Sequence, residues 1–208
     1  MEDTGTYKKR FTLLERIKIE KPSYEGFFFY AVFISNNMDA DIDSRSLLKG
    51  GFAMIFIDMD GVVAKWNAEA SVEDTRRRGY FLKRVPEKSV VKLVKALQKL
   101  GAPVCILSAA YDENAASEKS IWLDMVFGTS LDRIFVPYGS SKSDYTGGGR
   151  GNVLIDDFSS NLHAWEKSGN VGLKFYNGIN GTHGSWKGRY ITKDMSLGEM
   201  LEIVSEVI

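Results

Sequence analysis

From Met54 onward, short apolar runs alternate with stretches in which apolar residues recur at helical spacing. Continuous apolar runs are typical of strands that are buried on both faces of a parallel sheet. The pattern therefore predicts strands at Met54–Ile57, Pro103–Leu107, Arg133–Val136, Val153–Ile155 and Val171–Phe175.

The stretches that separate these runs predict helices. In Glu87–Leu100 the apolar residues fall on one helical face, and Gly101 is a typical residue at a helix end. Similar signals predict helices at Glu113–Phe127, Asn161–Lys167 and Leu197–Val207. Strands that alternate with helices predict an α/β fold, a three-layer α/β/α sandwich around a parallel five-stranded sheet.

Two segments depart from this alternation. We interpret residues 1–53, which include the apolar run Phe27–Ile34, as an N-terminal extension loosely attached to a core of residues 54–208. The alternative is that Phe27–Ile34 packs on the domain. Residues 66–86 separate the first strand from its helix, and we interpret them as a small cap over the site, or alternatively as a surface loop with a charged helix.

The charge balance and the single cysteine narrow the class of protein. Basic and acidic residues number 27 each, so the formal net charge is zero, which argues against a nucleic-acid-binding surface. Phe27–Ile34 is far shorter than a membrane helix, and the polar first residues do not resemble a signal peptide. Cys105 alone fits a reducing compartment. We therefore expect a cytoplasmic protein without nucleic-acid or membrane partners, and the oligomeric state stays open.

Charged and hydroxyl side chains stand at the ends of four predicted strands. In an open parallel sheet, ligands bind beyond the carboxyl ends of the strands, so these side chains should meet in one cleft. They are Asp58 and Asp60 after the first strand, Ser108 after the second, Lys142 after the third, and Asp156 and Asp157 after the fourth.

These residue types suit the transfer of a phosphoryl group. A carboxylate cluster would repel a phosphate ester unless it held a hard cation, and Mg²⁺ binds carboxylates together with phosphate oxygens. Asp58 can attack phosphorus, and Asp60 can protonate the leaving alcohol and then activate water. Lys142 and the hydroxyl of Ser108 can hold the transferring oxygens. Each feature alone has a structural explanation, such as a capped turn; the ordered set favours an active site.

The ordered motifs DMDGV, Ser108, Lys142 and IDD resemble the haloacid dehalogenase (HAD) superfamily of phosphohydrolases. The segments DMDGVVAKW, GYF (79–81) and LIDD, with the compact cap, resemble more narrowly its 5′(3′)-deoxyribonucleotidase branch and the bacterial and phage relatives of that branch. The resemblance spans about Met54 to Lys187. It implies a Rossmann-like core, dependence on Mg²⁺ and dephosphorylation of nucleoside monophosphates.

The resemblance also implies roles for individual residues. Asp58 would be the nucleophile, and Asp60 would be the acid and base. Metal ligands would be Asp58, Asp60 through its backbone carbonyl, and the pair Asp156 and Asp157, of which Asp157 would bind more directly. Phosphate would be bound by Ser108, Ala109 and Lys142. A nucleobase could stack on Trp66, Tyr80 or Phe81, although these aromatic residues could equally pack the cap onto the core.

The sequence leaves the substrate open. The first hypothesis is a 5′-nucleotidase, a phosphoric monoester hydrolase that takes a small-molecule phosphate ester, a (deoxy)nucleoside monophosphate. Phe158, where mammalian nucleotidases often have a basic residue, and the short cap leave the base preference undefined. The alternatives are a phosphatase for a sugar phosphate or a nucleic-acid phosphate end, and a non-catalytic binding protein on the same fold.

Overall fold

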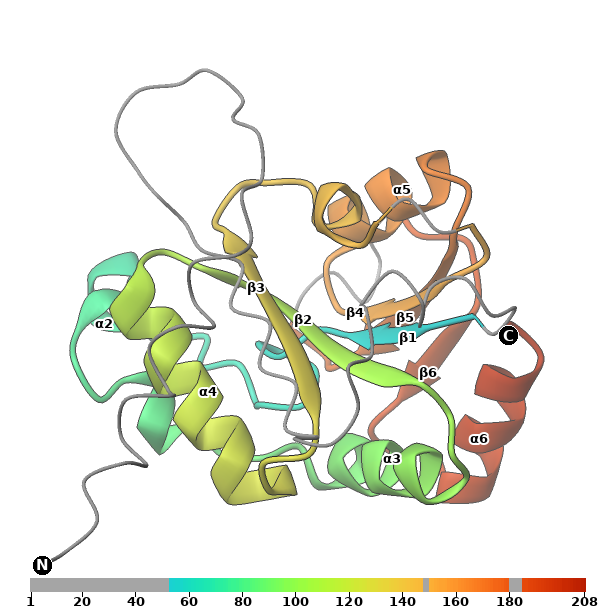
Figure 1. The fold of residues 1–208 in the computed structure, drawn as a ribbon, viewed down its shortest axis with the longest axis horizontal. Helices are drawn as coiled ribbons and strands as arrows, with labels where there is room; N and C mark the ends of the chain where they lie inside the picture. The colour runs from blue at the N-terminus through green and yellow to red at the C-terminus, as the bar shows by residue number, and fades with distance from the viewer. Residues whose placement is uncertain (1–52, 148–149, 180–184) are drawn as a thin grey trace, which may run out of the picture.

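A computed structural model describes residues 53–147, 150–179 and 185–208. The predicted N-terminal extension of residues 1–53, apart from its last residue, lies outside the described residues. The described part forms a single sheet with helices on both of its faces (Figure 1).

All strands of the sheet run parallel, in the order β3-β2-β1-β4-β5-β6. The first strand along the chain therefore lies in the middle, between the second and the fourth. The carboxyl ends of β1, β2 and β4 are neighbours for this reason. The strands are β1 (Ile55–Ile57), β2 (Val104–Ala110), β3 (Asp132–Pro137), β4 (Val153–Asp156), β5 (Val171–Tyr176) and β6 (Tyr190–Thr192).

The predicted α/β sandwich is confirmed, but the predicted strand number of five was wrong, because β6 adds a sixth. β6 pairs with β5 at the edge of the sheet, through Tyr190, Ile191 and Thr192. Of these three, only Ile191 is buried. A three-residue strand with one buried side chain has too little apolar pattern to be recognised in a sequence.

The helices occupy two layers around this sheet. Figure 1 shows α3, α4 and α6 on one face of the sheet and α5 on the other. No helix in the described ranges is long and apolar enough to cross a membrane. The helices are α2 (Val72–Arg76), α3 (Lys88–Lys99), α4 (Glu113–Phe127), α5 (Ser159–Lys167) and α6 (Leu197–Ser205), with 3₁₀ turns η1 (Phe81–Lys83) and η2 (Lys142–Tyr145).

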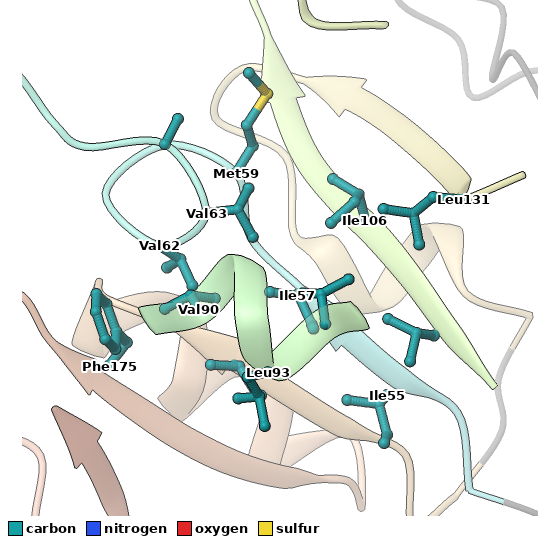
Figure 2. Close-up of a cluster of buried hydrophobic side chains, with 14 of the residues drawn as sticks. Ile55, Ile57, Met59, Val62, Val63, Val90, Leu93, Ile106, Leu131 and Phe175 are labelled. Carbon is teal, nitrogen blue, oxygen red and sulfur yellow. The ribbon is translucent and has the colours of Figure 1, made fainter. Parts of the chain in front are cut away.

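Each strand sends alternate side chains into the two layers, because successive residues of a strand point to opposite faces. In β1, Ile55 and Ile57 join the larger core, where Figure 2 shows them beneath Val90 and Leu93 of α3. Met200 and Val204 of α6 belong to the same core. Phe56 joins the smaller core on the other face, where its ring meets the edge of Trp165 from α5. Burial on both faces explains why β1 reads as a continuous apolar run.

Residues 66–86 leave and rejoin the core at one place. The amide of Lys65 donates to the carbonyl of Val85, and the amide of Glu87 donates to the carbonyl of Val63, at 2.8 Å each. Between these tied ends lie α2 and η1. The indole of Trp122 on α4 donates to the carbonyl of Arg84 at 2.8 Å, so this cap segment rests on α4.

Candidate active site

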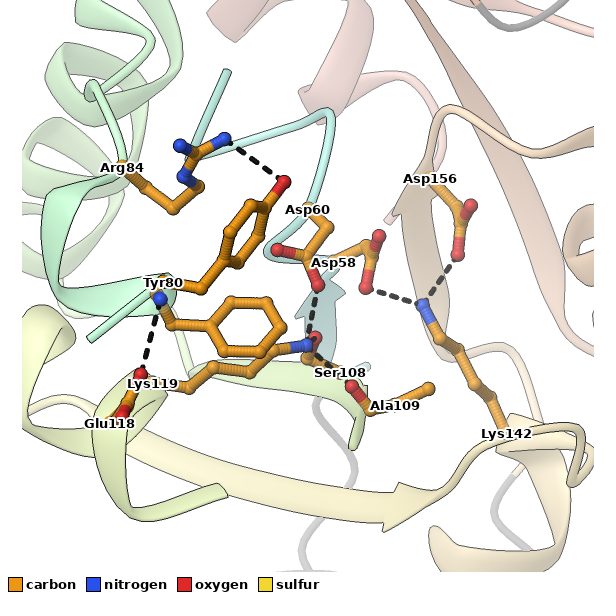
Figure 3. Close-up of polar contacts among 11 residues, drawn as sticks. Asp58, Asp60, Tyr80, Arg84, Ser108, Ala109, Glu118, Lys119, Lys142 and Asp156 are labelled. Carbon is orange, nitrogen blue, oxygen red and sulfur yellow. Dashed lines mark hydrogen bonds and ion pairs between the residues drawn. The ribbon is translucent and has the colours of Figure 1, made fainter. Parts of the chain in front are cut away.

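Side chains from the ends of β1, β2 and β4 converge at the carboxyl edge of the sheet (Figure 3). Asp58 follows β1, and its amide donates to the carbonyl of Ile155 in β4 at 2.9 Å. Ser108 lies in β2, and Asp156 ends β4. Lys142 reaches the same point from the start of η2, after β3. The convergence that the strand-end pattern predicts is therefore present.

Lys142 connects two of the carboxylates. Its Nζ lies 2.7 Å from Oδ1 of Asp58 and 2.6 Å from Oδ2 of Asp156, and all three residues are buried. Burial by itself would lower the pKa of Lys142, but the carboxylates of Asp156 and Asp58 outweigh it and raise this pKa. The lysine is therefore a permanent cation between the two aspartates.

The surroundings of Asp58 disfavour its ionised form. Burial, with only 7% of the residue exposed, is the main cause that raises its pKa from 3.8 to about 6. Within this shift the attraction of Lys142 lowers the pKa, and the charges of Asp156 and Asp60 raise it. A bound cation would relieve the cost of this clustered negative charge.

Asp156 is held on several sides. Its Oδ1 accepts a hydrogen bond from the amide of Phe158 at 2.7 Å, and its Oδ2 accepts one from the side chain of Asn161 at 2.9 Å. Oδ2 also accepts a hydrogen bond from the ammonium group of Lys142. Both oxygens of Asp156 are thus used within the protein, which suits a carboxylate that anchors the lysine.

Asp58, Asp156 and Asp157 offer a set of metal ligands. One carboxylate oxygen of each lies within 4.8 Å of those of the others. The carboxylate oxygens of three buried aspartates, gathered in this way, are ligands that fit Mg²⁺.

The backbone at Gly61 is shaped around Asp157. Gly61 has a φ of +83°, and a Cβ built on it would lie 2.1 Å from Oδ2 of Asp157. The same carboxylate oxygen accepts a hydrogen bond at 2.7 Å from the side chain of Asn177, which also donates to the carbonyl of Gly61. Only glycine lets the chain approach Asp157 so closely.

Replacement of Gly61 by alanine is expected to destabilise the protein and to weaken its affinity for Mg²⁺ by about 10-fold or more, because the new methyl group displaces Asp157. Gly101→Ala is the matched control, since Gly101 also has a positive φ, of +75°, but a Cβ there meets nothing within 4 Å. The Gly101→Ala control should lower the free energy of unfolding by only about 1–2 kcal/mol, the cost of the left-handed backbone conformation. Denaturant unfolding and calorimetric Mg²⁺ titration measure both effects, and equal losses in the two variants would contradict the role of the contact.

Asp60 points away from this carboxylate group. Its Oδ2 forms an ion pair with Nζ of Lys119, a buried lysine on α4 (Figure 3). The same ammonium donates to the hydroxyl of Ser108 at 3.1 Å and to the carbonyl of Ala109. Ser108 and Ala109, predicted to bind phosphate, therefore lie beside Asp60 and are held by Lys119; their binding of phosphate stays a prediction.

The three aromatic residues predicted to stack on a base have different surroundings. Phe81 is buried, and the centre of its ring lies 4.6 Å from Nζ of Lys119. Tyr80 packs edge-on against Phe81, and its hydroxyl accepts a hydrogen bond from Arg84 at 3.1 Å. Trp66 is partly buried at the start of the cap segment. Phe81 thus lies beside Lys119, and Tyr80 lies beside Phe81, while stacking on a base stays a prediction for all three aromatic residues.

Neither Lys119 nor Asn177 was predicted from the sequence as a site residue. Lys119 stands one helical turn before Trp122 and Leu123 on the apolar face of α4, and a charged residue on such a face is a signal of a buried polar partner. Asn177 directly follows β5, so the strand-end rule, extended to the fifth strand, points to it.

No protein-family model and no curated protein sequence matches this chain. Solved structures do match its fold. The D,D-heptose 1,7-bisphosphate phosphatase of B. bronchiseptica, solved with magnesium and phosphate, aligns with a TM-score of 0.54 at 14% identity, over 76% of this chain and 100% of its own. A Mesorhizobium loti protein described as a HAD-like phosphatase gives 0.52 at 12%, over 75% and 87%.

A HAD hydrolase of family IA, variant 3, from Entamoeba histolytica gives a TM-score of 0.50 at 12% identity, over 74% of this chain and 100% of its own. The fold is HAD-like. The matches bear on the backbone arrangement, since identities this low show fold alone. Within a HAD-like fold, the chemistry depends on this chain's own side chains at the carboxyl edge of the sheet.

Proposed function

We propose that the protein is a Mg²⁺-dependent phosphomonoester hydrolase of the HAD superfamily that works through an aspartyl-phosphate. The observation that carries the proposal is the buried position of Asp58, paired with Lys142 and within reach of Asp156 and Asp157. A carboxylate held against a fixed cation, beside further oxygen ligands, is suited to attack an anionic phosphorus centre.

The first half of the reaction uses both aspartates of the DMDG segment. An oxygen of the Asp58 carboxylate attacks phosphorus, and the bond between phosphorus and the leaving oxygen breaks. Asp60, in its protonated form, gives its proton to that oxygen, so that an alcohol leaves. Lys142 holds a phosphoryl oxygen and offsets the negative charge of the reacting group.

The second half returns both aspartates to their starting forms. Asp60, now a carboxylate, takes a proton from a water molecule while the water oxygen attacks phosphorus. The bond between phosphorus and the Asp58 oxygen breaks, which releases inorganic phosphate and restores the Asp58 carboxylate. Asp60 ends protonated, ready for another ester.

Asp58, Asp157 and the backbone carbonyl of Asp60 are the residues that would hold Mg²⁺. Of the aspartate pair, we propose Asp157 as the more direct ligand, with Asp156 beside it as the partner of Lys142. When bound, Mg²⁺ supplies charge neutralisation and orients a phosphoryl oxygen. The chain's own contribution is the placement of these ligands by β1, β4 and the turn at Gly61.

For the substrate we propose a nucleoside 5′-monophosphate. Support comes from Tyr80, a partly exposed aromatic residue of the cap segment that lies near Asp60, because an aromatic face can stack on a base. A sugar phosphate is the second candidate, because the structural match that is a heptose bisphosphate phosphatase acts on such an ester. The buried, unpaired thiol of Cys105 supports a cytoplasmic location.

A screen of Mg²⁺-dependent phosphate release tests the proposal. The purified protein is given nucleoside 5′- and 3′-monophosphates, sugar phosphates and p-nitrophenyl phosphate, each with Mg²⁺ and with a chelator. We expect release that requires Mg²⁺ and is fastest with a nucleoside 5′-monophosphate. Equal rates on all esters would remove the nucleotidase assignment, and no release on any ester would overturn the phosphatase assignment.

A further inference from the structure

Lys119 is a buried cation that the reaction described above does not use. Only 1% of the residue is exposed, although it lies beside the proposed acid and base. Its ammonium group has three protons to donate, and the structure shows three acceptors, on Asp60, Ser108 and Ala109. Burial of a charged side chain is costly unless it is fully paired, and here it is paired with Asp60.

The cap segment covers this cation. The centre of the Phe81 ring lies 4.6 Å from Nζ of Lys119. The neighbouring residue of α4, Glu118, accepts hydrogen bonds from the amides of Gly79 at 2.6 Å and Phe81 at 3.2 Å. Glu118 is itself buried and also accepts a bond from Asn114. Two adjacent residues of one helix thus fix the cap backbone and the Asp60 carboxylate (Figure 3).

Lys119 holds one carboxylate oxygen of Asp60, so the other oxygen is the one available for proton transfer. Oδ2 of Asp60 is taken by Lys119, while the side chain keeps 20% exposure. A carboxylate pinned by one oxygen presents its other oxygen in a defined direction, and proton transfer depends steeply on such alignment. A freely rotating aspartate would spend much of its time in other rotamers.

We propose that Lys119 is a positioning residue that holds the Asp60 carboxylate in the orientation for proton transfer, and that Phe81 shields this ion pair from water. The proposal rests on the proposed function, because it requires Asp60 to act as the acid and base. Lys119 touches neither substrate nor phosphorus in this role, which distinguishes it from Lys142.

With p-nitrophenyl phosphate as the substrate, the loss of Lys119 should slow the two half-reactions to different extents. p-Nitrophenolate is a weakly basic leaving group, so its departure needs little help from an acid. Hydrolysis of the aspartyl-phosphate needs Asp60 to take a proton from water whatever the substrate was. The second step should therefore slow more than the first, and the phosphoenzyme should accumulate.

The experiment is rapid-mixing kinetics of Lys119→Met with p-nitrophenyl phosphate and Mg²⁺. Methionine has a similar length and can pack under Phe81 without a charge. We expect steady-state turnover to fall about 10- to 100-fold. An initial burst of p-nitrophenol, approaching one per active site and larger than that of the unaltered protein, should precede it. The matched control is Lys92→Met, an exposed lysine on α3, which should behave as the unaltered protein does.

The outcomes separate this inference from the proposed function. If the unaltered protein releases no phosphate, the proposed function fails; if it is active and Lys119→Met slows the burst and the steady state equally, or neither, the positioning role is wrong. Lys119→Arg, which keeps the cation, should restore most of the steady-state rate. If Lys119→Met does not fold, Lys119→Gln, another uncharged replacement, takes its place in the same experiment: a burst larger than in the unaltered protein supports the role, and unchanged kinetics of both phases contradict it.

Discussion

Replacement of Asp58 by asparagine is expected to abolish Mg²⁺-dependent phosphate release, by about 10⁴-fold or more, with the fold intact. The amide cannot form an acyl phosphate, and it is a poorer metal ligand than a carboxylate. Stability should not suffer, because burial and the charges of Asp156 and Asp60 already disfavour the ionised form of Asp58. At neutral pH the metal-free variant should unfold at the same temperature as the unaltered protein or higher.

The matched control for this experiment is Asp132→Asn. Asp132 starts β3, at the amino edge of the sheet and away from the site, and burial also raises its pKa. This control should keep full activity. Phosphate release and thermal unfolding are measured on both variants. Substantial turnover by Asp58→Asn would show that another group attacks phosphorus.

Replacement of Lys142 by methionine is expected to harm both stability and catalysis. It leaves the carboxylates of Asp58 and Asp156 buried without their shared cation, and removal of one partner from a buried ion pair costs about 3–5 kcal/mol. Loss of a charge that stabilises the transition state should lower kcat by about 10²–10³-fold. Urea unfolding without metal and phosphate release with Mg²⁺ measure the two effects.

A double variant tests whether the stability loss has this electrostatic origin. Asp156→Asn removes one of the two stranded carboxylates, so Lys142→Met with Asp156→Asn should be less destabilised than the sum of the single variants. Lys92→Met is the control for loss of an exposed lysine and should unfold like the unaltered protein. Additive losses in the double variant would contradict the ion-pair explanation.

Most of the sheet could be predicted because its strands are buried on both faces. A buried strand such as β4 (Val153–Asp156) is marked by its apolar residues alone, whatever its neighbours are. The helix α4 was also predicted with its observed range, Glu113–Phe127. β6 could not be predicted in this way, because its pairing with β5 rather than its own pattern makes it a strand.

Part of the candidate site was also open to prediction from the sequence. Asp58, Lys142 and Asp156 each follow or end a strand, and parallel strands bring their carboxyl ends to one edge. The prediction that these residues meet needs only the order of the strands and their parallel direction. The sequence also placed Asp157 beside Asp156, but it could not say that Asp156 would bind Lys142 and that Asp157 would accept a hydrogen bond from Asn177.

The sequence by itself therefore determined the α/β class, the strand ends and the residues that meet there, because periodicity and order along the chain carry that information. Only the tertiary structure decided the pairing of Asp60 with Lys119, the use of Asp156 as an anchor and the contact between Gly61 and Asp157. These depend on distances between residues far apart in the chain. Such distances follow from how α4 and the cap segment pack on the sheet, and no local pattern records them.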